Sequence, residues 1–272
     1  MVLQNIAYFA VAVAIPGFYV GSLYYVEHKL RSNHPQALRK RFRAVSIISA
    51  ASVVVTYILL KLNNDDPLDK MGFHLYGTIA SAVFPLFLTS IFYSGTLVTC
   101  YLDGSLELLF SVKEWRRSFN NIQWVRYIIV GPLTEEIAFR SCGAVLILQC
   151  FPAWVAYLVY PLFFSVCHMH HLREDLHDGL SLKSALTYRL FQCSYTYLFG
   201  VYATYLFVQT GHILSPILVH AFCNSLGIPN VEEASQYPVR TRRLLWVAHI
   251  SGFIGWALAF PYLLYAPLYN FI

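Results

Sequence analysis

The chain has 272 residues, of which 57% are apolar and 12% charged, with a net charge of +5 and a mean hydropathy of +0.53. Soluble domains carry about 25% charged residues, so this composition excludes an ordinary soluble fold and indicates lipid as the outer solvent. The basic residues form no separate arm or domain, which argues against nucleic acid as a partner. Six cysteines without a CxxC pair predict neither a disulfide framework nor a thiolate metal site.

Eight apolar stretches are long enough, to within a few residues, to cross a bilayer as helices, which takes about 20 residues each. In chain order they cover residues 3–26, 44–61, 73–101, 124–150, 153–171, 186–209, 211–228 and 244–268. We therefore predict an all-α fold, a polytopic membrane helix bundle of about eight transmembrane helices. Because no linker or internal repeat divides the chain, residues 1–272 are expected to form a single membrane-embedded domain.

The lysine and arginine residues between these stretches predict how the chain is oriented. Sixteen fall on one side of the membrane and only two, Lys61 and Lys70, on the other. Loops rich in basic residues stay in the cytoplasm, so both termini are expected to face the lumen or exterior. The first of the basic loops carries Lys29, Arg31, Arg39, Lys40, Arg41 and Arg43.

Two adjacent carboxylates are the first candidates for chemistry. Of fourteen acidic residues, only Glu135 and Glu136 fall inside a predicted span. An ionisable residue there costs about 2.5–3.5 kcal/mol on insertion, so it indicates a functional site. Glu136 precedes Arg140 by four residues, which predicts an ion pair on one helical face. Glu135 points about 100° away from Glu136 and is the candidate base.

Two later stretches supply imidazole and amide groups. His168 lies near the end of the fifth stretch, and His220 and Asn224 stand four residues apart in the seventh. A carboxylate, two imidazoles and an amide suit peptide hydrolysis by an activated water, since bases take the water proton and donors stabilise the oxyanion. We expect these residues to share one polar cavity between neighbouring spans.

Together these residues form three motifs in a fixed order. They are EExxxR at Glu135, Glu136 and Arg140, FxxxH at Phe164 and His168, and HxxxN at His220 and Asn224. In these motifs the chain resembles the type II CAAX proteases, within the wider group of CAAX proteases and bacteriocin-processing enzymes. The resemblance covers a motif-bearing core at about residues 124–229. Residues 191–229 resemble the eukaryotic, Ras-converting branch of that family.

The resemblance implies a multi-pass endopeptidase of the endoplasmic reticulum membrane, in which the basic asymmetry predicts a lumenal N-terminus. It implies removal of the last three residues from farnesylated or geranylgeranylated CAAX proteins, such as Ras-like small GTPases, at a site reached from the cytosol and the bilayer. Carried over by motif position, Glu135 and His168 activate the attacking water, and His220 and Asn224 form the oxyanion hole. Glu136 and Arg140 support the structure. No cofactor and no metal are expected.

Two other functions stay open on the sequence. Carboxylates and histidines also bind zinc, which would make the chain a metal-dependent intramembrane protease, although it contains no HExxH motif. A transport protein or a non-catalytic protein of the same fold is the other alternative. Transporters are often built from repeated halves, and residues 1–123 show no resemblance to residues 124–272.

Overall fold

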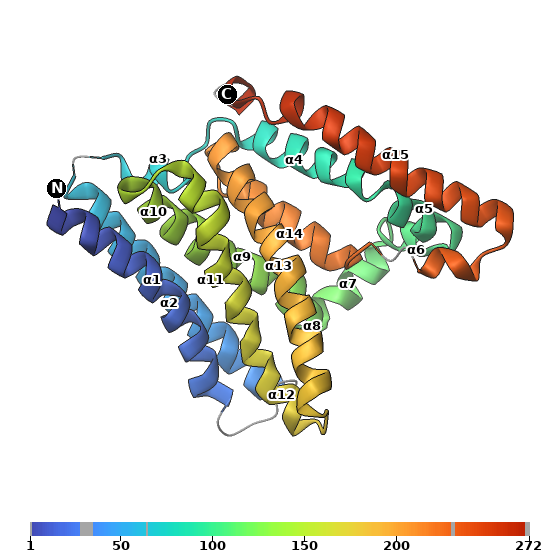
Figure 1. Ribbon diagram of the computed structural model, residues 1–272, viewed down its shortest axis with the longest axis horizontal. Helices are drawn as coiled ribbons and strands as arrows, with labels where there is room; N and C mark the ends of the chain where they lie inside the picture. The colour runs from blue at the N-terminus through green and yellow to red at the C-terminus, as the bar shows by residue number, and fades with distance from the viewer. Residues whose placement is uncertain (1, 28–34, 64, 230–231, 270–272) are drawn as a thin grey trace. The chain divides into compact units, whose positions relative to one another are not determined.

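A computed structural model describes residues 2–27, 35–63, 65–229 and 232–269, and within these ranges the chain forms helices and no strands (Figure 1). The all-α prediction is therefore confirmed. Two of the basic loop residues used to predict the orientation, Lys29 and Arg31, lie outside the described residues. The helices fall into two compact units, and the chain passes from one unit to the other after His74, Pro132 and Pro216. The first comprises Met1–His74 with Leu133–Pro216, and the second Leu75–Pro132 with Ile217–Ile272.

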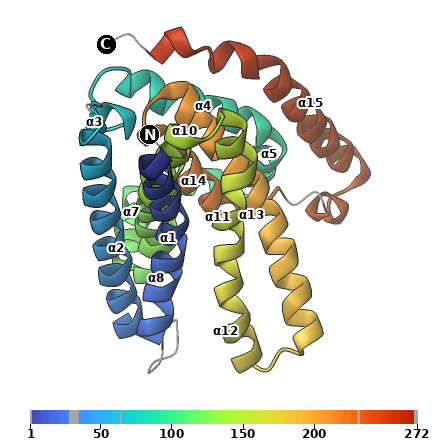
Figure 2. The same ribbon diagram turned by 60° about the vertical axis from the view of Figure 1, so that its left-hand side comes forward.

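The first unit begins with two long helices that pack side by side, α1 (Val2–Glu27) and α2 (Pro35–Lys61) (Figures 1 and 2). The sequence predicted that the second helix begins at residue 44, and this was wrong. Lysine and arginine are good helix formers, so the basic segment before the apolar run continues the helix instead of forming a loop. The buried residues of α2 recur every three or four positions, as one helical face requires. They include Arg41, Val45, Ser49, Ser52, Thr56 and Leu60.

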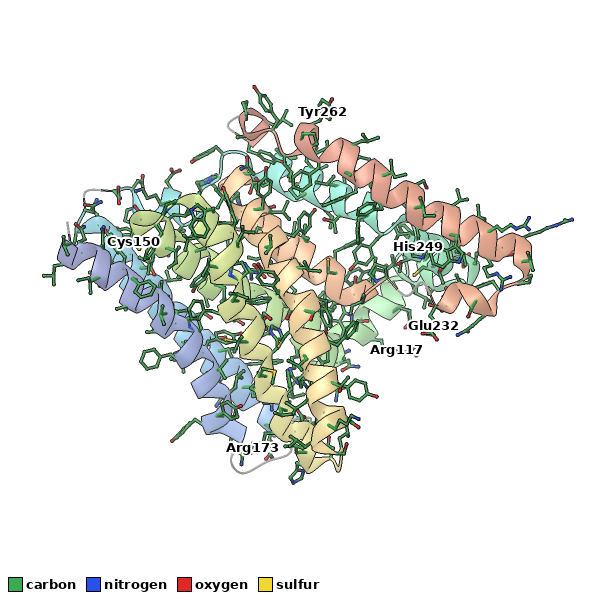
Figure 3. All side chains as sticks on the ribbon, viewed as in Figure 1. Arg117, Cys150, Arg173, Glu232, His249 and Tyr262 are labelled. Atoms are coloured by element: carbon green, nitrogen blue, oxygen red, sulfur yellow. The ribbon has the colours of Figure 1, made fainter. Side chains whose placement is uncertain are left out.

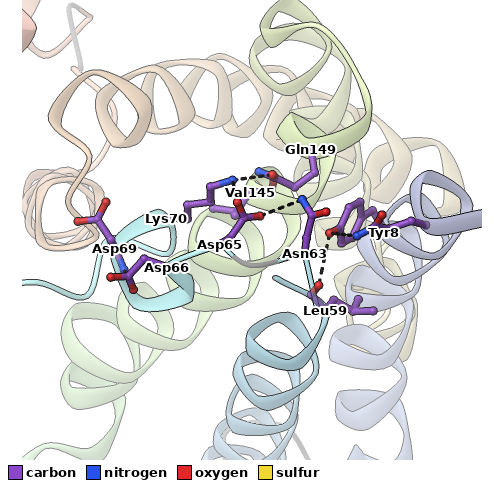
Figure 4. A network of polar contacts seen from close by, with 10 residues as sticks. Tyr8, Leu59, Asn63, Asp65, Asp66, Asp69, Lys70, Val145 and Gln149 are labelled. Atoms are coloured by element: carbon purple, nitrogen blue, oxygen red, sulfur yellow. Dashed lines mark hydrogen bonds and ion pairs between the residues drawn. The ribbon is translucent and has the colours of Figure 1, made fainter. Parts of the chain in front are cut away.

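A polar network closes the end of this unit where α1, α2, the short α3 (Pro67–Lys70) and the end of α10 (Val145–Cys150) meet (Figure 4). Lys70 donates to Asp65 at 2.7 Å and to Gln149 at 2.9 Å. The Tyr8 hydroxyl donates to the Leu59 carbonyl. In Figure 3, Cys150 lies near this end of the unit, whereas Arg173 lies at the opposite end. The network therefore links the ends of helices that are far apart in the sequence.

The motif-bearing stretch is one long helix in which the hydrogen-bond register changes four times. In order it contains α8 (Ile122–Val125), η1 (Arg126–Val130), α9 (Gly131–Glu136), η2 (Ile137–Ala144) and α10, where η1 and η2 are π-helical. The next stretch is similar, with the π-helical η3 (Val155–Val159), then α11 (Tyr160–Cys167), the 3-10 turn η4 (His168–His171) and α12 (Leu172–His177). Pro132 and Pro161 each stand two residues after a π segment, where the missing N–H disturbs the α register.

Helix α13 (Leu182–Thr210) packs along α11 (Figure 2). Ser181 caps its N-terminus, and the Ser181 side chain accepts from the Ser184 N–H. Two reciprocal contacts join the helices, because Ser165 Oγ donates to the Cys193 carbonyl at 2.6 Å and Cys193 Sγ contacts the Ser165 carbonyl. Gly200 allows the close approach, since a Cβ there would lie 3.0 Å from Pro161.

The second unit pairs α15 (Val239–Leu263) with α4 (Thr78–Phe92) and α5 (Ser94–Leu102). The sequence predicted one span over residues 73–101, whereas α4 and α5 are bent by 74° at Tyr93. The Ser94–Gly95 pair follows the break, and such pairs are common at sharp kinks. This unit also contains α6 (Ser105–Leu108), α7 (Val112–Asn120), α8, η1, η5 (Glu233–Gln236), η6 (Ala266–Tyr269) and most of α14 (Leu214–Leu226).

By length and composition, three helices in the described ranges could cross a membrane: Val2–Val26, Pro35–Lys61 and Val239–Leu263. The bent pair α4 and α5 makes a fourth if the two helices form one broken span. Each of the other predicted stretches also carries helix, but α14 has only 13 residues, and the others are divided by π segments or carry several polar residues. The count of eight spans therefore stays a prediction.

Candidate active site

The centre of the first unit is a buried ion pair between Glu136 and Arg140. Arg140 Nη1 lies 2.9 Å from Glu136 Oε2 and 3.0 Å from Oε1, and the two side chains are 0% and 1% exposed. This is the i, i+4 pair expected from their spacing. Arg140 Nη2 also donates to the Gly200 carbonyl at 3.4 Å, and its guanidinium stacks 4.3 Å from the Phe164 ring centroid. Two charges so deeply buried are tolerated only because they neutralise each other.

Glu135, one residue earlier, belongs to the part of α9 that is fixed against the first two helices. The Thr134 carbonyl accepts from Ser49 Oγ of α2 at 3.1 Å, and the Thr134 hydroxyl bonds to the Tyr19 hydroxyl of α1 at 2.8 Å. Glu135 itself is half-buried. Its charge acts on the thiol of Cys167, the residue before His168. The carboxylate of Glu135 therefore lies within electrostatic range of the end of α11.

His168 begins the η4 turn, and its tautomer follows from one hydrogen bond. Its Nδ1 lies 2.9 Å from the carbonyl oxygen of Phe164. A carbonyl oxygen only accepts, so Nδ1 carries the proton and, in the neutral ring, Nε2 keeps a lone pair. The Phe164 ring contacts the His168 ring edge-on at 5.0 Å between centroids. Phe164 therefore positions both the Arg140 guanidinium and an imidazole with a basic nitrogen.

The other two histidines of this turn make separate contacts. His170 Nδ1 bonds to the Cys167 carbonyl at 2.7 Å, and His171 Nδ1 lies 3.3 Å from a carboxylate oxygen of Glu174. Their rings lie 3.8 Å apart between centroids. Within the described ranges, no group of three or more histidine, cysteine, aspartate or glutamate side chains has the arrangement to hold a metal ion.

In the second unit, α14 carries His220 and Asn224 one turn apart. His220 is 7% exposed. Asn224 is exposed, and its side-chain Nδ2 donates to the carbonyl oxygen of Tyr127 in η1 at 2.9 Å. In this π segment the Gly131 N–H bonds to the Arg126 carbonyl, and the next residue, Pro132, has no N–H. A side-chain amide thus takes the place of the backbone donor that Tyr127 lacks.

The two groups of candidate residues therefore belong to different units. Glu135, Glu136, Arg140 and His168 lie in the first, and His220 and Asn224 lie in the second. Within the first unit, the ion pair, the Phe164 ring and the His168 imidazole form one continuous cluster. The convergence of all six residues on one substrate stays a prediction from the sequence.

Two features of these units were missed by reading the sequence. Arg41 was counted as a loop charge, but it is 3% exposed on α2. Its place four residues before Val45 and eight before Ser49, on the buried face, was the available signal. The bond from Asn224 to Tyr127 was also missed, although the proline five residues after Tyr127 signals a carbonyl without a backbone donor.

The apolar helices identify an α-helical membrane protein, and comparison with known proteins identifies its family. The model of the type II CAAX prenyl endopeptidase Rce1-like family matches residues 117–226. A "CAAX prenyl protease 2" of Caenorhabditis elegans is 38% identical over 86% of this chain and 86% of its own length. The protein of that name from Homo sapiens is 36% identical over 82% of this chain and 71% of its length.

A third protein of that name, from Arabidopsis thaliana, is 31% identical over 96% of this chain and 90% of its own length. No solved structure matches the chain significantly. With this level of identity over most of both chains, the protein belongs to the Rce1-like family of type II CAAX prenyl endopeptidases.

Proposed function

We propose that this protein is an intramembrane endopeptidase that removes the C-terminal tripeptide from prenylated CAAX proteins. Family membership supports a peptide-bond hydrolase. The observation that carries the chemistry is the hydrogen bond between His168 Nδ1 and the Phe164 carbonyl at 2.9 Å, because it leaves Nε2 as a base. The substrates are farnesylated or geranylgeranylated proteins, among them Ras-like small GTPases.

In the proposed reaction a water molecule attacks the carbonyl carbon between the prenylcysteine and the next residue. Glu135 and His168 take a proton from this water as its oxygen bonds to the carbon. The carbonyl oxygen becomes an oxyanion, which His220 and the second amide N–H of Asn224 stabilise. When the C–N bond breaks, the proton passes to the leaving amine. The products are a prenylcysteine carboxylate and a free tripeptide.

In this mechanism the ion pair of Glu136 and Arg140 holds the site without touching the substrate. It fixes the helix that carries Glu135, and through Phe164 it sets the position of His168. We propose that the reaction needs neither metal nor cofactor. Chelation of metal ions is then expected to leave the turnover of the purified protein unchanged, and loss of turnover restored by zinc would reverse this part of the proposal.

We place the protein in the endoplasmic reticulum membrane with eight transmembrane helices and a lumenal N-terminus. The basic asymmetry of the sequence supports this orientation. In the first unit, the exposed Lys40 lies near the start of α2 and Lys61 at its other end. The active site then opens to the cytosol and to the bilayer, which holds the prenyl chain.

The test is tripeptide release from a prenylated peptide by the purified protein in lipid nanodiscs. A farnesylated peptide with a CAAX ending is compared with the same peptide lacking the farnesyl group, and products are identified by mass spectrometry. We expect cleavage after the farnesylcysteine and a much slower reaction without the lipid, since apolar burial contributes about 0.8 kcal/mol per CH₂. Failure to release the tripeptide from the farnesylated peptide would refute the proposed function.

A further inference from the structure

Arg41 is a buried cation of the first unit that has no role in the reaction proposed above. It is 3% exposed and lies on the same face of α2 as Val45 and Ser49. Its charge acts on the imidazole of His170 in η4, the turn that His168 begins. Tyr24 of α1 contacts the same imidazole edge-on at 6.3 Å between ring centroids. Arg41 is therefore a buried charge within electrostatic range of the turn that carries a proposed catalytic base.

The position of Arg41 relative to Glu135 follows from the helix geometry. Ser49 bonds to the carbonyl of Thr134, the residue next to Glu135. Further along, Thr56 lies beside Cys142, so α2 and this helix run parallel. Arg41 precedes Ser49 by eight residues, which places it about 12 Å nearer the N-terminal end of α2 at ~1.5 Å per residue. Long side chains on both helices lean towards the helix N-terminus, so the offset between the two functional groups stays close to that value.

The proposed substrate has a group that suits this position. Cleavage after the prenylcysteine leaves three residues beyond the scissile bond, and the last of them carries the C-terminal carboxylate. Three extended residues span about 10–11 Å at 3.3–3.6 Å each. A tripeptide with its first peptide bond at Glu135 therefore reaches the level of Arg41. A guanidinium shielded from water binds a carboxylate strongly, through two parallel hydrogen bonds.

We propose that Arg41 is a specificity-determining residue that binds the C-terminal carboxylate of the substrate, an inference that rests on the proposed function. The contact fixes where the chain ends, and so it sets the distance from the C-terminus to the bond that is cleaved. Because the carboxylate is present before, during and after the reaction, Arg41 acts mainly on substrate affinity. Its loss is therefore expected in KM rather than in kcat.

The test compares two farnesylated peptides that differ only at the C-terminus, one ending in a carboxylic acid and the other in an amide. The wild-type protein in nanodiscs is expected to cleave the acid with a kcat/KM about 10- to 100-fold higher, the range for a hydrogen-bonded charge. In Arg41→Gln, the acid should fall to the level of the amide, while cleavage of the amide stays unchanged. The matched control is Arg43→Gln, which removes the same charge from an exposed position two residues along α2 and should change neither rate.

Three results would overturn the proposal: equal cleavage of acid and amide by the wild type, equal loss of both in Arg41→Gln, or full discrimination retained by that variant. Equal loss would mean that Arg41 only supports the helix packing. Should Arg41→Gln not fold, Arg41→Lys keeps the charge but not the bidentate geometry, and it must narrow the ratio of acid to amide at least threefold. An unchanged ratio contradicts the proposal. If the wild type cleaves neither peptide, the proposed function itself is wrong, whereas equal cleavage of both refutes only the role of Arg41.

Discussion

Asn224 Nδ2 donates to the carbonyl oxygen of Tyr127 at 2.9 Å. The bond replaces a backbone donor, because Gly131 bonds to Arg126 and Pro132 has no N–H. An amide nitrogen carries two protons. One is held by the π segment η1, which fixes the plane of the amide, and the other remains available for an oxyanion. A donor held in advance in this way is what transition-state stabilisation requires.

Asn224→Ala is therefore expected to lower kcat by about 10²- to 10³-fold, the usual cost of removing one oxyanion donor. KM for a prenylated peptide should change by less than about tenfold, because the carbonyl becomes an anion only in the transition state. Steady-state kinetics on folded protein in nanodiscs separates the two constants. His220→Ala should be at least as severe. A near-normal kcat in Asn224→Ala would show that this residue acts only in helix packing.

Pro132→Ala tests how the amide of Asn224 is held. The substitution supplies an N–H five residues after Tyr127, which can compete with Asn224 for the same carbonyl. We expect kcat to fall several-fold while Asn224 is still present and the protein remains folded. Pro85→Ala, which changes a proline inside α4, is the control and should leave kcat unchanged. Equal rates for Pro132→Ala and wild type would show that the bond to Tyr127 does not position the amide.

Glu136→Gln and Glu135→Gln should separate stability from chemistry. Removing the charge of Glu136 leaves that of Arg140 uncompensated at 1% exposure, and breaking a buried pair in this way costs about 3–5 kcal/mol. The thermal unfolding midpoint of Glu136→Gln in detergent should therefore fall clearly below that of the wild type. Glu135→Gln should keep a midpoint near wild type and lose turnover. If Glu136→Gln has normal stability and selectively loses turnover, Glu136 is the catalytic carboxylate and Glu135 the structural one.

Cys167→Ala should keep most of the activity. The thiol lies within electrostatic range of Glu135, but its Sγ contacts the carbonyl of Pro16 at 3.8 Å. The proposed reaction uses water as its nucleophile. Cys150→Ala, at the other end of the unit, is the matched control. If Cys167→Ala is folded yet inactive while Cys150→Ala is active, a covalent mechanism through this thiol has to replace the one proposed.

Accessibility labelling tests the orientation with a matched pair on one helix. Lys40 and Lys61 are both exposed, one near the start of α2 and one at its end. Each is changed to cysteine in a protein whose accessible native cysteines are replaced. In sealed microsomes, an impermeant thiol reagent outside should label position 40 and leave position 61 unlabelled until the membrane is opened. The opposite pattern would invert the topology.

The helices of the fold could be predicted from the sequence because long apolar runs leave a chain in lipid no other way to satisfy its backbone. Their bounds and bends could not. The basic segment around Arg41 lowers the hydropathy but not the helix propensity, so the start of α2 at Pro35 was missed. The bend at Tyr93 depends on the local Ser94–Gly95 pair, which a hydropathy pattern does not register.

In the candidate site too, some features could be predicted from the sequence and others could not. Spacing alone was enough for the ion pair of Glu136 and Arg140, because i, i+4 residues share a helical face. The tautomer of His168 depends on which carbonyl its ring meets, and that depends on the rotamer adopted at the end of α11. The three π segments change the register of hydrogen bonds without a change in residue type. In the sequence, only the prolines that follow two of these π segments indicate the change of register.

The measurement that tests the account most directly is product analysis in ¹⁸O-labelled water, with wild type and Glu135→Gln side by side. Purified protein in nanodiscs is incubated with a farnesylated CAAX peptide, and both products are weighed by mass spectrometry. We predict that the wild type releases the intact tripeptide and places one ¹⁸O atom in the new carboxylate of the farnesylcysteine, while Glu135→Gln, equally folded, releases neither product. No tripeptide from the wild type, or wild-type turnover by Glu135→Gln, would contradict the account.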